Sequence, residues 1–148
     1  MQLIGTTNVP WALMSRSLFS NPNPDYIVCE GWMKTPALTG NGICEIGFKD
    51  DAEYVYAGAG LNITNGNGMI FCRVGGTIQN IQVFSYDQWY KVRLAFTASH
   101  HSISVWVNDT LKVSNVAGVM SSTVYTRFFM RAGSGTIPFD FDDIKIWY

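Results

Sequence analysis

Two stretches near the middle of the chain alternate apolar and polar side chains with a period of two. The apolar positions are Val92, Leu94 and Phe96 in the first stretch and Ile103, Val105 and Val107 in the second. The positions between them hold Lys91, Arg93, Ala95, Ser104, Trp106 and Asn108. A period of two is typical of strands buried on one face only. With a turn at residues 98–101, the two stretches predict an antiparallel hairpin whose outer face carries a tryptophan and two cations.

The rest of the chain also favours strands, and no segment predicts a helix. Gly, Pro and Asn interrupt nearly every window, and no helical apolar spacing persists. The expected strands are Trp11–Phe19, Tyr26–Lys34, Ile43–Lys49, Tyr54–Leu61, Met69–Val74, Thr77–Phe84, Trp89–Phe96, Ile103–Val107, Thr110–Val113, Val124–Arg131 and Phe139–Tyr148. Many short strands at this spacing indicate an all-β sandwich or barrel.

Several connectors carry residues suited to tight turns. Thr39–Gly42 and Asn65–Gly68 each contain an asparagine and glycines, which tolerate the positive φ that tight hairpins require. The pair Gly75–Gly76 has the same property, and the charged segment Lys49–Glu53 is typical of a hairpin tip. These turns predict antiparallel neighbours.

Composition and charge limit the kinds of partner. At 148 residues the chain predicts one domain, either a whole protein or a module of a longer one. Its charged content of 14% is low, its net charge is −1, and it has no Lys/Arg run. Nucleic-acid binding normally needs a basic stripe, so we expect no such partner. No apolar run approaches the ~20 residues of a membrane span, so we expect no membrane insertion.

The cellular setting is open at the level of sequence. The segment Met1–Gly5 lacks the basic region and long apolar stretch of a secretory signal. The chain is therefore an intracellular protein, a piece of a longer secreted chain, or a viral protein that needs no signal. Because uncharged polar residues dominate its polar composition, we expect an extracellular, cell-surface or virion-associated module.

The chain has three cysteines, Cys29, Cys44 and Cys72, each inside an apolar run. None has the spacing of a metal-thiolate motif. We expect them to be small buried hydrophobic residues. A single Cys29–Cys44 or Cys44–Cys72 disulfide is the alternative.

Three segments together resemble the concanavalin-A-like lectin/glucanase superfamily, and within it the laminin-G-like modules. They are Asp25–Lys34, then Asp87–Leu94 followed by Ile103–Asn108, and the closing Phe139–Tyr148. The resemblance covers about residues 25 to 148 and implies an antiparallel β-sandwich of the jelly-roll type. Members of the superfamily include lectins, carbohydrate-binding modules, glucanases, polysaccharide lyases and adhesion modules, so the fold does not decide the function.

The sequence does not carry the acids of the glucanase members. Their strand alternates glutamate, aspartate and glutamate, which places the carboxylates on one face. The nearest candidate, Cys44–Asp50, has one acid, a glycine and a lysine on that alternation, and Asp140 and Asp142 lie on the closing strand. Possible lyase residues are Tyr54, Tyr56, His100 and His101, but both histidines fall in a predicted turn. We therefore expect a protein that is not an enzyme.

The predicted hairpin offers a candidate ligand face. A turn centred on Ser99 and His100 would set Arg93 opposite Trp106 and Lys91 opposite Asn108. An indole wall beside hydrogen-bond donors suits a sugar. The candidate ligand-binding residues are Trp106, Arg93, Lys91, Asn108 and, from the strand that also carries Tyr26 and Glu30, Trp32. In the alternative, Arg93 stacks on Trp106 as a cation–π pair, or a loop or another subunit covers that indole.

Two further tryptophans and three acids complete the list of candidates. Trp89 and Trp147 are expected to be structural, with Trp147 capping the core. The resemblance implies a structural calcium held by Glu30 with Asp142 or Asp143, since related modules often hold an ion there. The alternative is a β-bulge at Asp142–Asp143, because the inward alternation slips by one residue at this point.

The sequence favours a non-catalytic, lectin-like module that binds carbohydrate weakly or attaches a larger protein to a surface. No cofactor is required by this hypothesis, apart from the possible calcium. The second hypothesis is a structural or adhesion module of a virion or cell surface with a protein partner. A small glycan hydrolase or lyase is less favoured.

Overall fold

A computed structural model describes residues 2–4, 11–17, 26–36, 39–49, 56–75, 77–97, 102–117, 127–133 and 137–147. Within this part of the chain there are twelve strands and no helix. The strands are β1 (Gln2–Ile4), β2 (Trp11–Ser17), β3 (Tyr26–Lys34), β4 (Gly42–Lys49), β5 (Tyr56–Thr64), β6 (Asn67–Val74), β7 (Thr77–Val83), β8 (Tyr90–Thr97), β9 (Ser102–Val107), β10 (Thr110–Ala117), β11 (Arg127–Gly133) and β12 (Pro138–Trp147). In these segments, therefore, nothing is long, helical and apolar enough to cross a bilayer.

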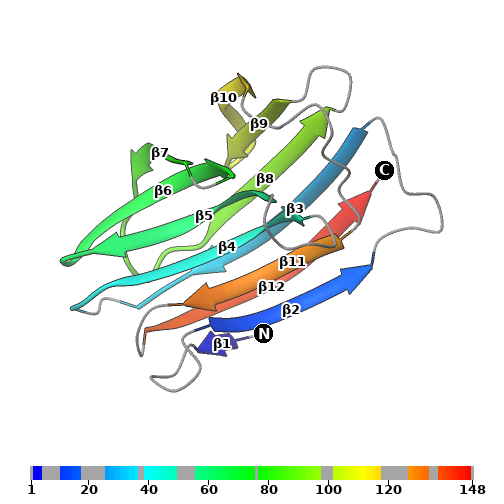
Figure 1. Ribbon diagram of the computed structural model, residues 1–148. Helices are drawn as coiled ribbons and strands as arrows, with labels where there is room; N and C mark the ends of the chain where they lie inside the picture. Colours follow the sequence, from blue (N-terminus) through cyan, green and yellow to red (C-terminus); the bar gives the residue numbers. More distant parts are fainter. Residues whose placement is uncertain are drawn as a thin grey trace.

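The strands form two six-stranded sheets that lie face to face (Figure 1). Sheet A has the order β1-β12-β3-β8-β9-β10, and sheet B has the order β2-β11-β4-β5-β6-β7. Every neighbouring pair is antiparallel. The prediction of an all-β antiparallel sandwich is therefore confirmed.

The core lies between the two sheets and is built from the inward alternation of each strand. Sheet A contributes Ile27, Cys29, Met33, Val92, Leu94, Phe96, Ile103, Val105, Val107, Phe139 and Phe141, all at most 2% exposed. Sheet B contributes Cys44, Ile46, Phe48, Ala57, Ala59, Leu61, Ile63, Ile70, Cys72 and Met130, all at most 1% exposed. Burial of this apolar surface is the main force that holds the sheets together.

Each of the eleven strands expected from the sequence has a counterpart here. The bounds of β3 match the expectation, whereas β5, β6 and β10 extend beyond the expected ranges. The short strand β1 was not expected, because its three residues are too few to show a period. The expected strand Val124–Arg131 corresponds to β11, and its first residues, 124–126, lie outside the described residues.

The turn predictions hold at two places and fail at one. Asn65 and Gly66 have φ of 52° and 75°, and Gly75 has φ of 58°, so the hairpins β5–β6 and β6–β7 turn as expected. The expected hairpin at Thr39–Gly42 is wrong. Gly40 does have a positive φ of 123°, but this segment joins β3 of sheet A to β4 of sheet B. The expected hairpin tip after Lys49 lies outside the described residues.

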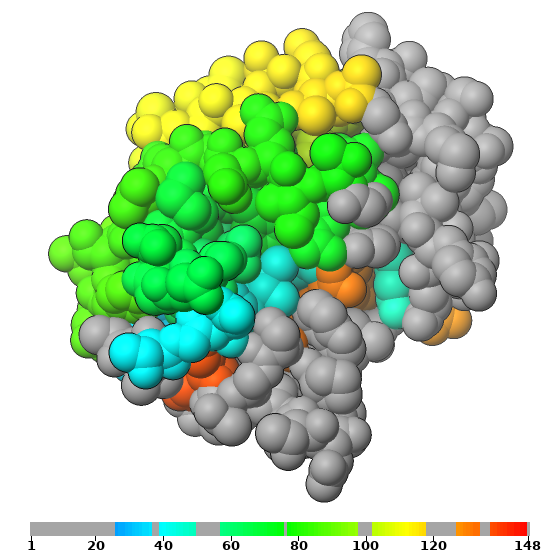
Figure 2. All heavy atoms as spheres, turned by 60° about the vertical axis from the view of Figure 1, so that its left-hand side comes forward, coloured from blue at the N-terminus to red at the C-terminus, as the bar shows by residue number. Residues whose placement is uncertain are grey.

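Two of the edge strands, β7 and β10, are irregular. Between Ile70 and Phe71 the register of β6 with β7 shifts, so Ile81 is an extra residue on β7. The register of β10 with β9 shifts twice, and Asn115 there has φ of 53°. Both strands lie on the same side of the molecule, where the yellow atoms of residues 110–117 adjoin the green atoms of the neighbouring sheet (Figure 2). Register shifts of this kind are β-bulges.

The three cysteines are free and buried, as expected, and form no disulfide. Cys29 lies in sheet A, whereas Cys44 and Cys72 lie in sheet B. Burial raises the pKa of the Cys29 and Cys44 thiols far above the usual range. They remain protonated and act as small apolar residues of the core.

We expect the close approach of β4 and β5 to make Gly47 intolerant of a side chain. A Cβ at Gly47 would lie 2.7 Å from the Gly58 Cα, and backbone atoms cannot move aside as a side chain can. Gly47→Ala should therefore lower the free energy of unfolding by about 1–3 kcal/mol. Chemical denaturation measures the change.

Val83→Ala is the matched control, because Val83 is 72% exposed on β7 and its truncation should change stability by less than about 0.5 kcal/mol. Equal stability of the Gly47→Ala variant and the unmodified protein would contradict the described packing of β4 on β5.

Candidate ligand-binding face

The outer face of sheet A gathers the candidate residues, because four neighbouring strands place them in rows. Asp142 of β12 is in register with Trp32 of β3, which is in register with Lys91 of β8. In the next row, Glu30 of β3 is in register with Arg93 of β8, and Arg93 with Trp106 of β9. Since side chains alternate across each strand, all these residues point away from the core.

The predicted pairing of β8 with β9 is confirmed. Arg93 is opposite Trp106, and Ala95 is opposite Ser104. The guanidinium carbon of Arg93 lies 6.0 Å from the centre of the Trp106 ring, so the cation–π alternative also describes the structure. Trp106 is half-buried on this face.

The two candidate cations belong to an ion-pair network. Arg93 Nε donates to Glu30 Oε2 at 2.7 Å, and Lys91 Nζ lies 2.7 Å from Asp109 Oδ1. Cross pairs join Arg93 to Asp109 at 3.5 Å and Lys91 to Glu30 at 4.0 Å. Glu30 is only 6% exposed, so its carboxylate depends on these partners for solvation. The network fixes Lys91 and Arg93 in place.

Asn108 holds the turn between β9 and β10. Its backbone N–H donates to the carbonyl oxygen of Lys91 at 2.9 Å, and its Oδ1 accepts the backbone N–H of Lys91 at 2.9 Å. Asn108 and Asp109 have φ of 48° and 64°, as a two-residue hairpin turn requires. The carboxamide oxygen of Asn108 is therefore engaged by the backbone, and its Nδ2 is the group that remains to face a ligand.

A groove crosses this face beside the network. It has a volume of about 520 Å³ and is lined by Trp32, Trp89, Asp142 and Asp143. This volume is within the range of small-molecule sites, about 300–1,000 Å³. Two indoles and two carboxylates thus converge from β3, from the loop before β8 and from β12.

Asp142 reaches the groove by the regular alternation of β12, and a bulge after it brings Asp143 to the same side. The bulge confirms the predicted alternative for this position. The register of β12 with β3 shifts between Asp142 and Lys145. Asp143 has φ of 46°, and its backbone N–H donates to Asp142 Oδ1 at 2.9 Å. The extra residue turns Ile144 and Ile146 back toward the core, against which both pack.

The calcium residues are not gathered into one group. Glu30 pairs with Arg93, and Asp143 Oδ2 lies 2.6 Å from Lys145 Nζ. Among the described residues no three or more His, Cys, Asp or Glu side chains come together as metal ligands would. A structural calcium stays a prediction of the resemblance.

One expectation about tryptophan is wrong. Trp147 does not cap the core, because it follows the outward alternation of β12 after the bulge and is 41% exposed. Trp89 lies directly before β8, is 40% exposed and lines the groove, and its structural role stays a prediction. The outward alternation of Lys91 and Arg93 extends back to Trp89, a signal that the sequence did contain.

Cations of the chain lie over both groove indoles. Lys34 Nζ lies 5.0 Å from the centre of the Trp89 ring and 3.6 Å from Asp140 Oδ2. Lys91 Nζ lies 6.0 Å from the centre of the Trp32 ring. These contacts hold the indoles in fixed orientations from one side.

Sheet B carries a separate buried charge cluster on the face turned away from the core. Glu45 is 0% exposed, and its Oε1 accepts hydrogen bonds from the Arg131 guanidinium. Its Oε2 lies 3.8 Å from Arg73 Nε. Burial raises the pKa of the Glu45 carboxyl above its usual value of 4.5, and the guanidiniums of Arg131 and Arg73 act in the opposite direction. This carboxylate is enclosed by its partners and lies in the other sheet from the groove.

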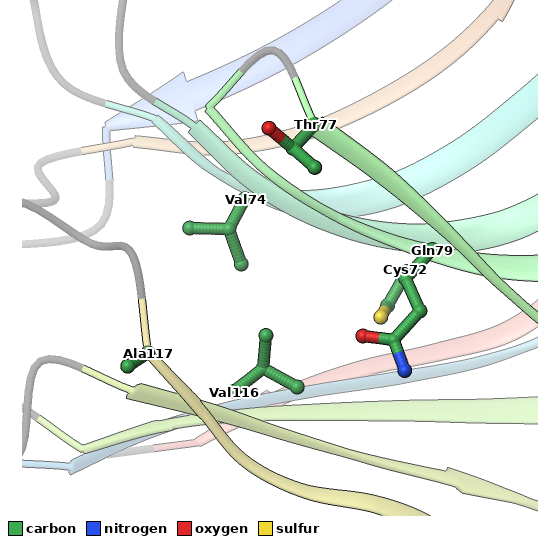
Figure 3. Close-up of a pocket in the computed structure, with 6 residues that line it drawn as sticks. All are labelled: Cys72, Val74, Thr77, Gln79, Val116 and Ala117. Carbon is green, nitrogen blue, oxygen red and sulfur yellow. The ribbon is translucent and has the colours of Figure 1, made fainter.

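A second hollow lies at the open edge between the sheets, with a volume of about 160 Å³ (Figure 3). It is lined by Cys72, Val74, Thr77, Gln79, Val116 and Ala117, which come from β6, β7 and β10. Burial raises the pKa of the Cys72 thiol, so this sulfur is not a thiolate nucleophile. The six lining residues that the structure describes include no charged group that could orient a polar ligand.

Comparison with known proteins establishes the fold. No family model matches the sequence, and no curated protein matches it either. Among solved structures, a sialidase matches with a TM-score of 0.75 and 12% identity over 99% of this chain, which spans only 15% of the sialidase's length. The carbohydrate-binding module CBM66 from Bacillus subtilis matches with a TM-score of 0.56 and 11% identity over 98% of this chain and 94% of its own. A tetrameric galectin from the ball sponge Cinachyrella sp. matches with a TM-score of 0.63 and 10% identity over 93% and 100%.

These likenesses define the class of fold. The chain has the jelly-roll β-sandwich fold of these solved structures, which is the fold that the sequence motifs implied. The narrower likeness to laminin-G-like modules stays a prediction.

The buried Glu45 carboxyl should give the stability of the protein a distinct pH dependence. Because its pKa in the folded state is raised, the folded protein binds this proton more tightly than the unfolded chain does. The free energy of unfolding should then fall as the pH rises from about 4.5 through the folded pKa. Urea denaturation at a series of pH values, compared between the unmodified protein and Glu45→Gln, isolates this contribution.

Asp87→Asn removes a carboxylate from an exposed position and serves as the control variant in the same measurement. A Glu45-dependent rise in the free energy of unfolding with pH would contradict this prediction. Attraction between the Glu45 carboxylate and the two guanidiniums would then outweigh the cost of its burial.

Proposed function

We propose that this chain is a non-catalytic carbohydrate-binding module and that the groove between Trp32 and Trp89 holds the saccharide. The main support for this proposal is the groove, which places two indoles and two carboxylates on an open sheet face. Indole faces pack against the C–H faces of sugar rings, and carboxylate oxygens accept hydrogen bonds from sugar hydroxyls. The module would attach a larger protein or particle to a glycan surface outside the cell.

The fold supports this proposal without proving it. The solved structures with the same fold include a carbohydrate-binding module and a galectin, and also a sialidase. The non-catalytic role is supported by the groove's acids. Asp142 and Asp143 are adjacent on one bulge, whereas two-carboxylate hydrolysis needs acids on either side of the scissile bond.

The second candidate function is a protein-interaction or adhesion module. Large apolar side chains are exposed on strands of the same sheet, including Tyr26 at 49%, Leu111 at 50% and Trp147 at 41%. Leu111 is in register with Trp106, which continues the apolar surface toward the edge strand β10. Such a surface suits a protein partner if the groove takes no sugar.

Truncation of the groove indoles should abolish most glycan binding. We expect Trp32→Ala and Trp89→Ala each to weaken binding about tenfold or more, since each removes one wall of the groove. A glycan array identifies the ligand, and calorimetry with that ligand measures the loss. Thermal unfolding shows whether each variant folds.

Trp147→Ala is the matched control, because it removes an equally exposed indole of sheet A that does not line the groove. Its affinity for the glycan should be unchanged. Equal losses in all three variants, or no glycan binding by the unmodified protein together with concentration-dependent self-association, would refute the proposal in favour of the interaction module.

A further inference from the structure

Among the described residues, every acidic side chain on the outer face of sheet A except one lies close to a cation of the chain. Glu30 pairs with Arg93 at 2.7 Å, Asp109 with Lys91 at 2.7 Å, Asp140 with Lys34 at 3.6 Å and Asp143 with Lys145 at 2.6 Å. Each of these carboxylates therefore has a cation from a neighbouring position. The exception lies inside the groove.

That exception is Asp142. Its Oδ1 accepts the backbone N–H of Asp143 at 2.9 Å, and the described residues offer it no ion pair. The side chain is exposed, lines the groove and is in register with Trp32. A carboxylate beside an indole is a favourable place for a cation that the chain itself does not supply.

The indoles of the groove already accept ammonium groups. Lys34 Nζ over Trp89 and Lys91 Nζ over Trp32 show that both rings are oriented to present a face to a primary ammonium. The described lining residues include no cation, but these two lysines lie beside the indoles, and Lys145 pairs with Asp143. Asp142 is therefore the one described carboxylate of the groove whose charge is not paired within the described part of the chain.

We infer that the groove prefers a saccharide that carries a free ammonium group on its ring, a 2-amino-2-deoxy sugar, over the same saccharide with a hydroxyl, an acetamide or a carboxylate. This inference rests on the proposed carbohydrate-binding function. The sugar ring packs against the indoles, and its ammonium group lies beside Asp142, with the paired Asp143 adjacent. A uronic acid is disfavoured because its carboxylate would face the unpaired carboxylate of Asp142, which has the same sign.

The test uses four trisaccharides that differ in one substituent, and calorimetry at about pH 6, where the amine is protonated. They are the β-1,4-linked trimers of glucosamine, glucose, N-acetylglucosamine and glucuronic acid. The first three differ only in the substituent on C2, and the last differs from the glucose trimer only at C6. We expect glucosamine to bind about fivefold more tightly than the neutral sugars, as suits one exposed ion pair with a cation–π contribution. The uronic acid should bind most weakly. Short oligomers of equal length keep polycation effects small.

The decisive variant is Asp142→Asn, which keeps the shape of the side chain and removes its charge. It should remove the preference for glucosamine and leave affinity for the neutral sugars unchanged. Asp87→Asn removes the same charge from an exposed position that does not line the groove, and it should keep the preference.

The outcomes separate this inference from the proposed function. Neutral binding that depends on Trp32, without a preference for glucosamine, overturns the inference alone. A preference that survives in Asp142→Asn also overturns it, because the amine is then recognised elsewhere. Failure of all four trisaccharides to bind overturns the inference, whereas the proposed function is contradicted only if the glycan array shows no ligand at all.

Discussion

The rest of this structure depends on one interaction, which is the packing of the apolar inner faces of the two sheets against each other. Cys29, Leu94 and Val105 occupy one row of the core across β3, β8 and β9. Their burial decides that Arg93 and its neighbours face outward, since side chains alternate strictly along a strand. A slip of one residue in any of these strands would turn charged groups inward at a cost far above the ~5–15 kcal/mol that stabilises a typical domain. The composition of the outer face is therefore a consequence of packing on the inner one.

The outer face of sheet A combines a network of ion pairs with a groove in which the carboxylate of Asp142 has no ion pair among the described residues. The β8–β9 hairpin and its neighbours hold an ion-pair network of Glu30, Arg93, Lys91 and Asp109. Because these charges neutralise one another, few of them are available to bind a ligand. The groove lies next to this network, where regular pairing with β3 positions Asp142 and a bulge positions Asp143. Residues on paired strands hold a fixed geometry better than residues on long loops do. A shallow, preorganised groove of this kind suits weak and repeated attachment rather than tight capture.

The sequence predicted the architecture well because period-two alternation reports burial directly. It placed β3 correctly, paired β8 with β9 in the right register and located the bulge at Asp142–Asp143. It failed where tertiary connectivity decides the outcome. Thr39–Gly42 has the chemistry of a hairpin turn but joins two sheets, which no local pattern reveals. The same limit explains why the sequence chose Trp106 as the main indole and missed the convergence of Trp89 with Trp32. The proximity of those two side chains depends on where a loop ends beside a strand of distant sequence.

The bulges in β7 and β10 have a consequence for how the molecule behaves when crowded. Both strands end their sheets, and within the described part of the chain one side of each backbone has no partner strand. An uninterrupted edge would be a template for pairing with another chain and so for precipitation. The extra residue at Ile81 and the left-handed Asn115 break the regular spacing of those free N–H and C=O groups. Copies arrayed side by side on a surface could thus remain separate molecules at high local density.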